Sequence, residues 1–278
     1  MNRRSLISRC LQGGLAVLGV MLAVSCSREA APPGKKESKF SGPCVQYFAH
    51  GIVYHDPAKS TQMEPQYLLI FNPSARDTEV KFTLYFEDQD PVSFSYPVAA
   101  ERVWGTEMIS NKTIPQFKRF GGRIESAERV IVQLTSGIFN SASAEKRATC
   151  LIFSSFICSE TLSTTNCYAD GIVAEDENVF ESENIHLLNP NKEKAHVTLK
   201  AIFDENAAGK NFTRQYEIQP ERLLVIETKS LVKPSMVNFG SIYTSDVPIL
   251  AQVHRILTDK KDQGRIAANY RLMLKQSL

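Results

Sequence analysis

The sequence predicts an all-β protein with two tandem antiparallel β-sandwich domains that follow a signal peptide and a flexible linker. Two observations lead to this prediction. The chain repeats itself at offsets of 117 to 120 residues, and each copy shows short apolar–polar alternation without a long helical stripe. The expected segments are a signal peptide (1–25), a linker (26–43), repeat one (44–158), a junction (159–166) and repeat two (167–278).

Four motifs occur twice, in the same order along the chain. The pairs are YFAHGIVYHD (47–56) with CYADGIVAED (167–176), YLLIFNP (67–73) with NIHLLNP (184–190), VAAERV (98–103) with IQPERL (218–223), and VIVQLT (130–135) with ILAQVH (249–254). Solenoid repeats have periods of roughly 20–50 residues, so this period is too long for them. It suits two copies of a domain of ordinary size, and therefore indicates a tandem duplication.

Within each copy the pattern is that of β-strands. The segment VKFTLYF (80–86) places four apolar side chains on one face and Lys81, Thr83 and Tyr85 on the other, and HVTLKAIF (196–203) repeats the pattern. Period-two alternation with one polar face is typical of half-buried antiparallel strands. More continuously apolar runs, as expected for central strands, are RVIVQL (129–134) and PILAQV (248–253).

The first 25 residues have the features of an export signal. Three arginines, Arg3, Arg4 and Arg9, precede an uncharged run over 11–24 that is too short for a stable membrane span. The following Cys26 resembles the lipobox cysteine of bacterial lipoproteins. This resemblance implies that Cys26 becomes the first mature residue and carries a lipid. The alternative is cleavage near Ala23 or Ser25, which would give a soluble product.

The mature chain is nearly neutral and begins with a flexible tether. Segment 27–43 is rich in Pro, Gly, Ser and charged residues, as in flexible linkers. The whole sequence has 32 basic and 30 acidic residues, and removal of the signal leaves 29 against 30. No dense basic stripe is present, so nucleic-acid binding is not expected. We expect a protein of the bacterial cell envelope, attached to the membrane through Cys26 at the outer membrane or the periplasmic face.

Four cysteines remain once the signal and the lipid are set aside: Cys44, Cys150, Cys158 and Cys167. An even number in an exported chain predicts two disulfides. Three pairings are open, and we favour Cys44–Cys150 with Cys158–Cys167. A zinc site and buried free thiols are the alternatives.

Two longer segments resemble a known bacterial family. They are YFEDQDPVSFSYPVAAERV (85–103) and SDVPILAQVHRI (245–256). They are similar to the ITIYYSDKEPVG, VPAR and VPIVVQHTR motifs of the family named after the Anabaena sensory rhodopsin transducer, and the similarity extends from about Cys44 to Leu257. The resemblance implies a compact antiparallel β-sandwich that looks like a carbohydrate-binding module and forms homo-oligomers. A rhodopsin partner is not expected, because the founding transducer works in the cytoplasm whereas this chain is exported.

Repeat two keeps more of the family pattern than repeat one. The candidate ligand-binding residues are Glu183, Asn189, Arg222, Gln252 and Arg255. In repeat one Gln66 and Ser136 stand in place of the acid and the arginine. Such groups can hold a glycan or a small polar ligand through charge-assisted hydrogen bonds. Alternatively, they satisfy turns and one another, and the chain is a structural or adaptor lipoprotein that binds another envelope protein.

The sequence gives little support for an enzyme. It contains no G-x-S-x-G, H-E-x-x-H or P-loop motif, so neither catalytic residues nor a cofactor are expected. His50 and His55 with Asp56 come nearest to a metal cluster, but we interpret them as surface loop residues and expect no metal. The family histidine falls at Val253, and His254 one place later should face the opposite side of the sheet.

Overall fold

The computed structural model describes residues 42–55, 62–64, 66–140, 149–175, 179–204, 210–232, 237–259, 264–272 and 274–275. These residues form antiparallel strands and two short 3-10 helices, with no α-helix among them. Within these ranges no helix is long and apolar enough to cross a membrane. The signal peptide, the linker up to residue 41 and Cys26 lie outside the described residues.

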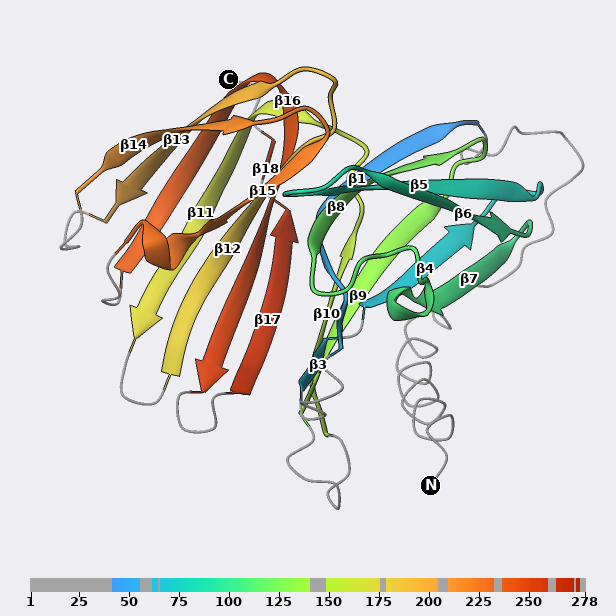
Figure 1. Ribbon diagram of the computed structural model, residues 1–278, viewed down its shortest axis with the longest axis horizontal. Coiled ribbons are helices and arrows are strands. Elements are labelled where there is room, and N and C mark those ends of the chain that lie inside the picture. Colours follow the sequence, from blue (N-terminus) through green and yellow to red (C-terminus); the bar gives the residue numbers. More distant parts are fainter. Residues whose placement is uncertain are drawn as a thin grey trace, which may run out of the picture. The chain divides into compact units, whose positions relative to one another are not determined.

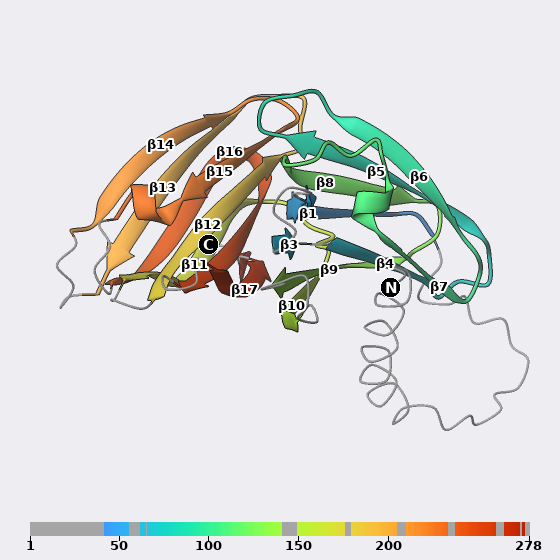
Figure 2. The same ribbon diagram turned by 60° about the horizontal axis from the view of Figure 1, so that its bottom comes forward.

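Repeat one is a sandwich of two antiparallel layers. Its elements are β1 (Cys44–Ile52), β2 (Tyr54–His55), β3 (Gln62–Glu64), β4 (Gln66–Asn72), β5 (Thr78–Phe86), β6 (Val92–Val98), β7 (Arg102–Glu107), η1 (Met108–Ser110), β8 (Arg119–Ser126), β9 (Ile131–Asn140) and β10 (Thr149–Ile157). One layer has the order β1-β8-β5-β6, and the other has the order β2-β3-β9-β4-β7 with β10 beside β9. Figures 1 and 2 both show β5 and β6 in a layer apart from β4 and β7.

Repeat two has the same order of elements. They are β11 (Ser163–Glu175), β12 (Val179–Asn189), β13 (Ala195–Phe203), β14 (Phe212–Ile218), β15 (Arg222–Glu227), η2 (Thr228–Ser230), β16 (Val237–Asp259), β17 (Gly264–Leu272) and β18 (Leu274–Lys275). The strand β11 begins four residues before the predicted start of this repeat, and the domain limits themselves stay a prediction. The observed architecture confirms the predicted all-β tandem fold.

The long strand β16 replaces two strands of repeat one. Its first part pairs with β11 and β13, and its second part pairs with β12 and β17. The two layers of repeat two are therefore joined into one eight-stranded sheet with the order β14-β13-β16-β11-β12-β15, in which β17 also pairs with β16 and β18 with β11. In repeat one residues 127–130 interrupt the corresponding path between β8 and β9.

The alternation read from the sequence places the core. In β5 the residues Val80, Phe82, Leu84 and Phe86 are all fully buried, and Lys81 on the other face is exposed. Tyr85 differs from the prediction, because it is buried on the face expected to be polar. It packs in a small apolar cluster with Leu188 and Leu223, so repeat two covers this part of the outer face of β5.

The repeated Ala-x-Gly motif has a steric reason. Gly51 lies opposite Phe120 in the β1–β8 pair, and Gly171 lies opposite Phe239 in the β11–β16 pair. A Cβ at Gly51 would lie 2.2 Å from the nearest ring atom of Phe120, and one at Gly171 would lie 2.7 Å from the ring and the carbonyl oxygen of Phe239. Each glycine therefore leaves the space that the aromatic ring of the neighbouring strand occupies.

A buried asparagine closes the Asn-Pro turn in each repeat. The amide of Asn189 donates hydrogen bonds of 2.8–3.2 Å to three backbone oxygens, those of Glu193, Ile218 and Gln219. The amide of Asn72 does the same in repeat one, to the oxygens of Arg76, Val98 and Ala99. The asparagine recurs because one side chain satisfies backbone groups of two turns.

The Glu-Arg segment of each repeat forms the second turn that the buried asparagine contacts. Glu101 and Glu221 have positive φ angles of 52° and 55°. Their N–H groups donate to the carbonyl oxygens of Ser74 and Asn191, both at 3.0 Å. The left-handed backbone of a residue with a Cβ costs about 1–2 kcal/mol, so these hydrogen bonds help to hold a strained turn in place.

The two predicted disulfides are wrong. Cys44 and Cys158 both carry free thiols, which excludes the Cys44–Cys150 and Cys158–Cys167 pairings. The sulfur of Cys44 instead accepts a hydrogen bond of 3.5 Å from the Val130 N–H. It therefore satisfies a backbone donor between the end of β8 and the start of β9. Cys158 lies in the hydrophobic core, where burial raises the pKa of its thiol. The side chain of Cys150 lies outside the described residues.

Candidate functional site

Repeat two contains a polar cluster built on three neighbouring strands. Glu183 of β12 and Arg255 of β16 are direct cross-strand neighbours, and Tyr168 and Asp170 lie on β11. Arg255 donates to Glu183 Oε1 from Nε at 2.9 Å and from Nη2 at 2.8 Å. Its Nη2 also lies 3.1 Å from the Tyr168 hydroxyl and 3.2 Å from Asp170 Oδ2. The structure therefore brings together two of the predicted site residues, Glu183 and Arg255.

The carboxylate at the base of this cluster is fully enclosed. Glu183 is 0% exposed, and it also accepts hydrogen bonds from the Tyr168 hydroxyl at 2.9 Å and the Ile172 N–H at 3.3 Å. Burial raises the pKa of Glu183, and the hydrogen bonds from Arg255 and Tyr168 oppose that rise. Burial disfavours the charged Arg255, but its hydrogen bonds and charge interaction with Glu183 prevail and raise the pKa of the guanidinium.

The cluster reaches the surface on one side. The Arg255 side chain is 18% exposed, and that of Asp170 is 56% exposed. A buried acid thus anchors a guanidinium, and the outer edge of that guanidinium lies beside an accessible carboxylate. This arrangement offers donors and an acceptor to a polar ligand at the surface.

Repeat one lacks the cluster at the corresponding positions. The aligned motifs place Phe48 and His50 where repeat two has Tyr168 and Asp170. Gln66 and Ser136 are cross-strand neighbours, as Glu183 and Arg255 are, and they share a neutral hydrogen bond of 3.2 Å. The ion pair of repeat two is therefore replaced by an uncharged contact.

Two other predicted site residues lie elsewhere. Asn189 and Arg222 face each other across β12 and β15, six residues along β12 from Glu183. At about 3.3 Å per residue this separation is about 20 Å. The amide of Asn189 donates to the backbone oxygens of its turn. Arg222 donates to Asp90 of repeat one at 2.9 Å. The structure does not bring these two residues to Glu183.

The fifth predicted residue, Gln252, faces repeat one. Its Oε1 accepts a hydrogen bond of 3.0 Å from the backbone N–H of Ala49. Val253 belongs to the core of repeat two. As predicted, His254 points to the opposite side, the side that Gln252 also faces.

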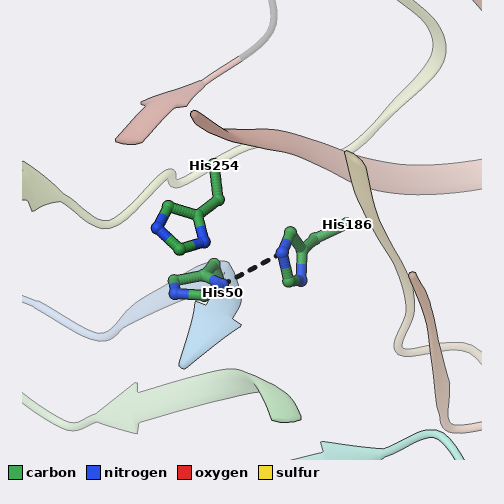
Figure 3. Close-up of side chains that lie close together, drawn as sticks. All are labelled: His50, His186 and His254. Atoms are coloured by element: carbon green, nitrogen blue, oxygen red, sulfur yellow. Dashed lines mark hydrogen bonds between the residues drawn. The ribbon is translucent and has the colours of Figure 1, made fainter. Parts of the chain in front are cut away.

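Three histidines meet at this contact between the repeats. Figure 3 shows His50 of β1 beside His186 of β12 and His254 of β16. Nδ1 of His50 lies 3.0 Å from Nε2 of His186. All three side chains are buried, so the interpretation of His50 as a surface loop residue is wrong, because β1 runs through it and repeat two covers it. Burial, together with the charge of Arg119, lowers the pKa of His186 to about 3.

Sequence reasoning missed Tyr168 and Asp170 as partners of the ion pair, and it missed the histidine cluster. The first two could have been found by comparing the Ala-x-Gly motifs position by position, since the two copies differ there. No sequence signal joins His50 to His186 and His254, because their contact depends on how the two repeats pack.

Repeat two also has a surface pocket between β13 and β14. Its lining residues are His196, Val197, Thr198, Gln215, Tyr216 and Glu217. The pocket combines one aromatic ring with several polar groups, a combination that suits small polar ligands.

Several solved structures resemble this chain. The Thermotoga maritima 1070 structure is 17% identical, with 44% of this chain and 95% of that chain covered and a TM-score of 0.34. The Anabaena sensory rhodopsin transducer is 22% identical, with coverage of 34% and 97% and a TM-score of 0.29. A Bacteroides uniformis β-glucuronidase is 7% identical, with coverage of 84% and 26% and a TM-score of 0.17.

The comparison with curated protein sequences gave no match. The family model described as Anabaena sensory rhodopsin transducer matches this chain twice, over residues 48–150 and 164–270. The two matched segments correspond to the two sandwiches and together make up most of the chain. The chain belongs to the Anabaena sensory rhodopsin transducer family.

Proposed function

We propose that this chain is a membrane-tethered, non-catalytic binding module of the bacterial cell envelope, and that repeat two recognises a glycan or another small polar ligand. Family membership supports a non-enzymatic transducer or binding role. The tether and the envelope location rest on the sequence alone, on the export signal and the lipobox-like Cys26.

The observation that carries the ligand proposal is the difference between the two repeats. Repeat two has a tyrosine, two acids and an arginine at four positions where repeat one has Phe, His, Gln and Ser. A β-sandwich of this family forms without these four groups, since repeat one has the sandwich fold with Phe, His, Gln and Ser at the four positions. The cluster of repeat two is therefore available for a binding role that the fold alone does not require.

The ligand chemistry follows from the accessible edge of the cluster. Asp170 can accept hydrogen bonds from hydroxyl groups, and Arg255 can donate to their oxygens. Neighbouring hydroxyls of a sugar ring match this pair of one acceptor and several donors. Glu183 and Tyr168 are too deeply buried to touch the ligand and would hold the guanidinium in place.

The test is a glycan array with the full chain, purified in detergent, followed by titration of the best ligand. The Asp170→Asn variant removes the accessible charge and leaves no buried charge unpaired. We expect it to weaken binding about tenfold or more, because hydrogen bonds to charged groups contribute about 1.5–3 kcal/mol. The Arg255→Ala variant should abolish binding, and far-UV circular dichroism checks that it still folds.

Two controls make the outcome decisive. Arg102→Ala removes an exposed arginine from repeat one and should leave affinity unchanged. Tyr216→Ala alters the pocket between β13 and β14. If Asp170→Asn binds as tightly as the wild type while Tyr216→Ala does not bind, the ligand occupies the pocket and the proposal for the cluster is wrong.

A second candidate is an adaptor that binds another envelope protein. Phe71 of β4 and Val103 of β7 are direct cross-strand neighbours and remain 40% and 66% exposed. Adjacent exposed apolar side chains of this kind favour a protein partner. Membership of a family described as a sensory rhodopsin transducer is consistent with a protein partner. Crosslinking in native membranes with Phe71→Lys as the comparison tests this candidate, and an unchanged crosslinking pattern would contradict it.

A further inference from the structure

The contact between the two repeats combines an apolar cluster with a group of imidazoles. Ala49 and Tyr85 of repeat one pack with Leu188, Leu223 and Leu250 of repeat two. Beside this cluster, each of the three histidines offers one nitrogen, and these three nitrogens all lie within 4.8 Å of one another. Figure 3 shows the three rings close together, with a nitrogen of His50 pointing to a nitrogen of His186.

The polar groups here are not all satisfied by protein partners. Nδ1 of His186 and Nε2 of Gln252 are buried and have no hydrogen-bond partner among the described residues, while Nε2 of His186 is the nitrogen that faces His50. A buried polar atom left unpaired costs about 1–3 kcal/mol, so such groups need a physical explanation. A hydrogen bond between two imidazoles uses only one nitrogen of each ring.

The geometry lies close to that of a metal site. With metal–nitrogen distances of about 2.0–2.1 Å, tetrahedral ligand nitrogens lie roughly 3.4 Å apart. The nitrogens of His50 and His186 are already 3.0 Å apart. All three nitrogens lie within 4.8 Å of one another. If the rings rotated so that each nitrogen moved by about 1 Å, all three nitrogens could therefore bind one ion.

The three histidines come from both repeats. His50 lies on β1, and the other two lie on adjacent strands of repeat two, where His186 pairs with Gln252 and His254 pairs with Asn184. A shared ion would therefore join two domains that otherwise meet through apolar contacts, the hydrogen bond from Ala49 to Gln252 and partly exposed ion pairs. The Arg119–Glu227 pair at 3.2 Å is one such ion pair, and Glu227 partly neutralises Arg119, whose charge acts on His186.

We propose that His50, His186 and His254 bind a divalent transition-metal ion of the zinc class and that this ion joins repeat one to repeat two. Imidazole nitrogen suits Zn²⁺, Co²⁺, Ni²⁺ and Cu²⁺, whereas Ca²⁺ and Mg²⁺ require oxygen ligands. Three protein ligands leave a fourth position for water or hydroxide.

The test uses the full chain in detergent, purified with a tag that contains no histidine and dialysed against a chelator. Zn²⁺ is then titrated by calorimetry, and Co²⁺ serves as a spectroscopic probe. We expect one ion per chain and intense visible Co²⁺ bands typical of a four-coordinate site. His186→Gln and His254→Gln should each weaken binding more than about 100-fold, because even loss of an outer-shell partner costs 10–100-fold.

The matched control is His196→Ala. His196 is 60% exposed and lies beside Asp246, and its removal should not change the affinity. The proposal is overturned if the wild-type chain does not bind one equivalent of Zn²⁺ or Co²⁺. It is also overturned if His186→Gln binds as tightly as the wild type, or if binding is lost with His196→Ala. If the glutamine variants do not fold, X-ray absorption of the wild-type Zn²⁺ complex decides, and fewer than three imidazole ligands would reject the site.

Discussion

Placing a methyl group at Gly51 should destabilise repeat one by about 3 kcal/mol. In the Gly51→Ala variant the Cβ would lie 2.2 Å from Cε2 and 2.7 Å from Cζ of Phe120. Ordinary carbon contacts are about 3.5–4.0 Å, so the ring would have to move by more than about 1 Å. Phe120 is fully buried and packs against Phe48 and Phe86, with ring centroids 6.1 Å and 6.0 Å away. Overpacking of such a core costs about 1–3 kcal/mol, and this tight contact belongs at the upper end.

Urea unfolding followed by tryptophan fluorescence measures this loss. Trp104 is the sole tryptophan, and it lies in repeat one with its ring 4.2 Å from that of Tyr96. A loss of about 3 kcal/mol corresponds to a fall in Tm of roughly 6–12 °C for a chain of this size. The matched control is Gly240→Ala, whose Cβ would meet nothing closer than the Tyr168 oxygen at 3.7 Å. If Gly51→Ala and Gly240→Ala unfolded at the same urea concentration, the steric explanation of the Ala-x-Gly motif would be refuted.

Three further predictions concern other parts of the chain. Asn189→Ala should lower the free energy of unfolding by about 2–4 kcal/mol, because it leaves three backbone oxygens of two turns without their donor; an effect below 1 kcal/mol in denaturation experiments would contradict this. Burial raises the pKa of Tyr85 to about 12, so the folded state keeps its proton where the unfolded state loses it, and stability should fall as pH rises from 10 to 12. At pH 11 that loss is about 1.4 kcal/mol, and Tyr85→Phe should not show it; equal pH profiles for the two proteins would count against the assignment. Labelling with a palmitate analogue in the native host should mark the wild-type chain and not Cys26→Ala, whereas equal labelling would remove the lipid anchor.

The motifs that recur in the sequence predicted the fold well because each meets a local physical requirement. Gly51 leaves room for an aromatic ring, Asn72 closes a turn, and the alternation in β5 separates a buried face from an exposed one. Such requirements depend on residues close together in the same domain. The cross-strand partnership of Glu183 with Arg255 was predictable for the same reason, since both belong to motifs of one repeat.

The remaining features depend on contacts between distant parts of the chain, two of them on how the two repeats pack, and this information is not in any single motif. Tyr85 was assigned to a solvent face that repeat two covers. Gln252 was assigned to a ligand site, and it instead bonds to the backbone of repeat one. Cys44 was assigned to a disulfide, and its sulfur instead satisfies the backbone between two strands. In each case a residue of the expected chemistry found a partner that is distant in sequence.

The continuity of β16 has a consequence for how each repeat opens. In repeat two a single strand carries hydrogen bonds of both layers, so neither layer can separate without loosening a strand that the other also needs. Amide hydrogens along β16 should therefore exchange with solvent as one cooperative unit. In repeat one the break at residues 127–130 lets β8 and β9 exchange at different rates. The duplication has thus produced two domains with the same order of strands and different cooperativity.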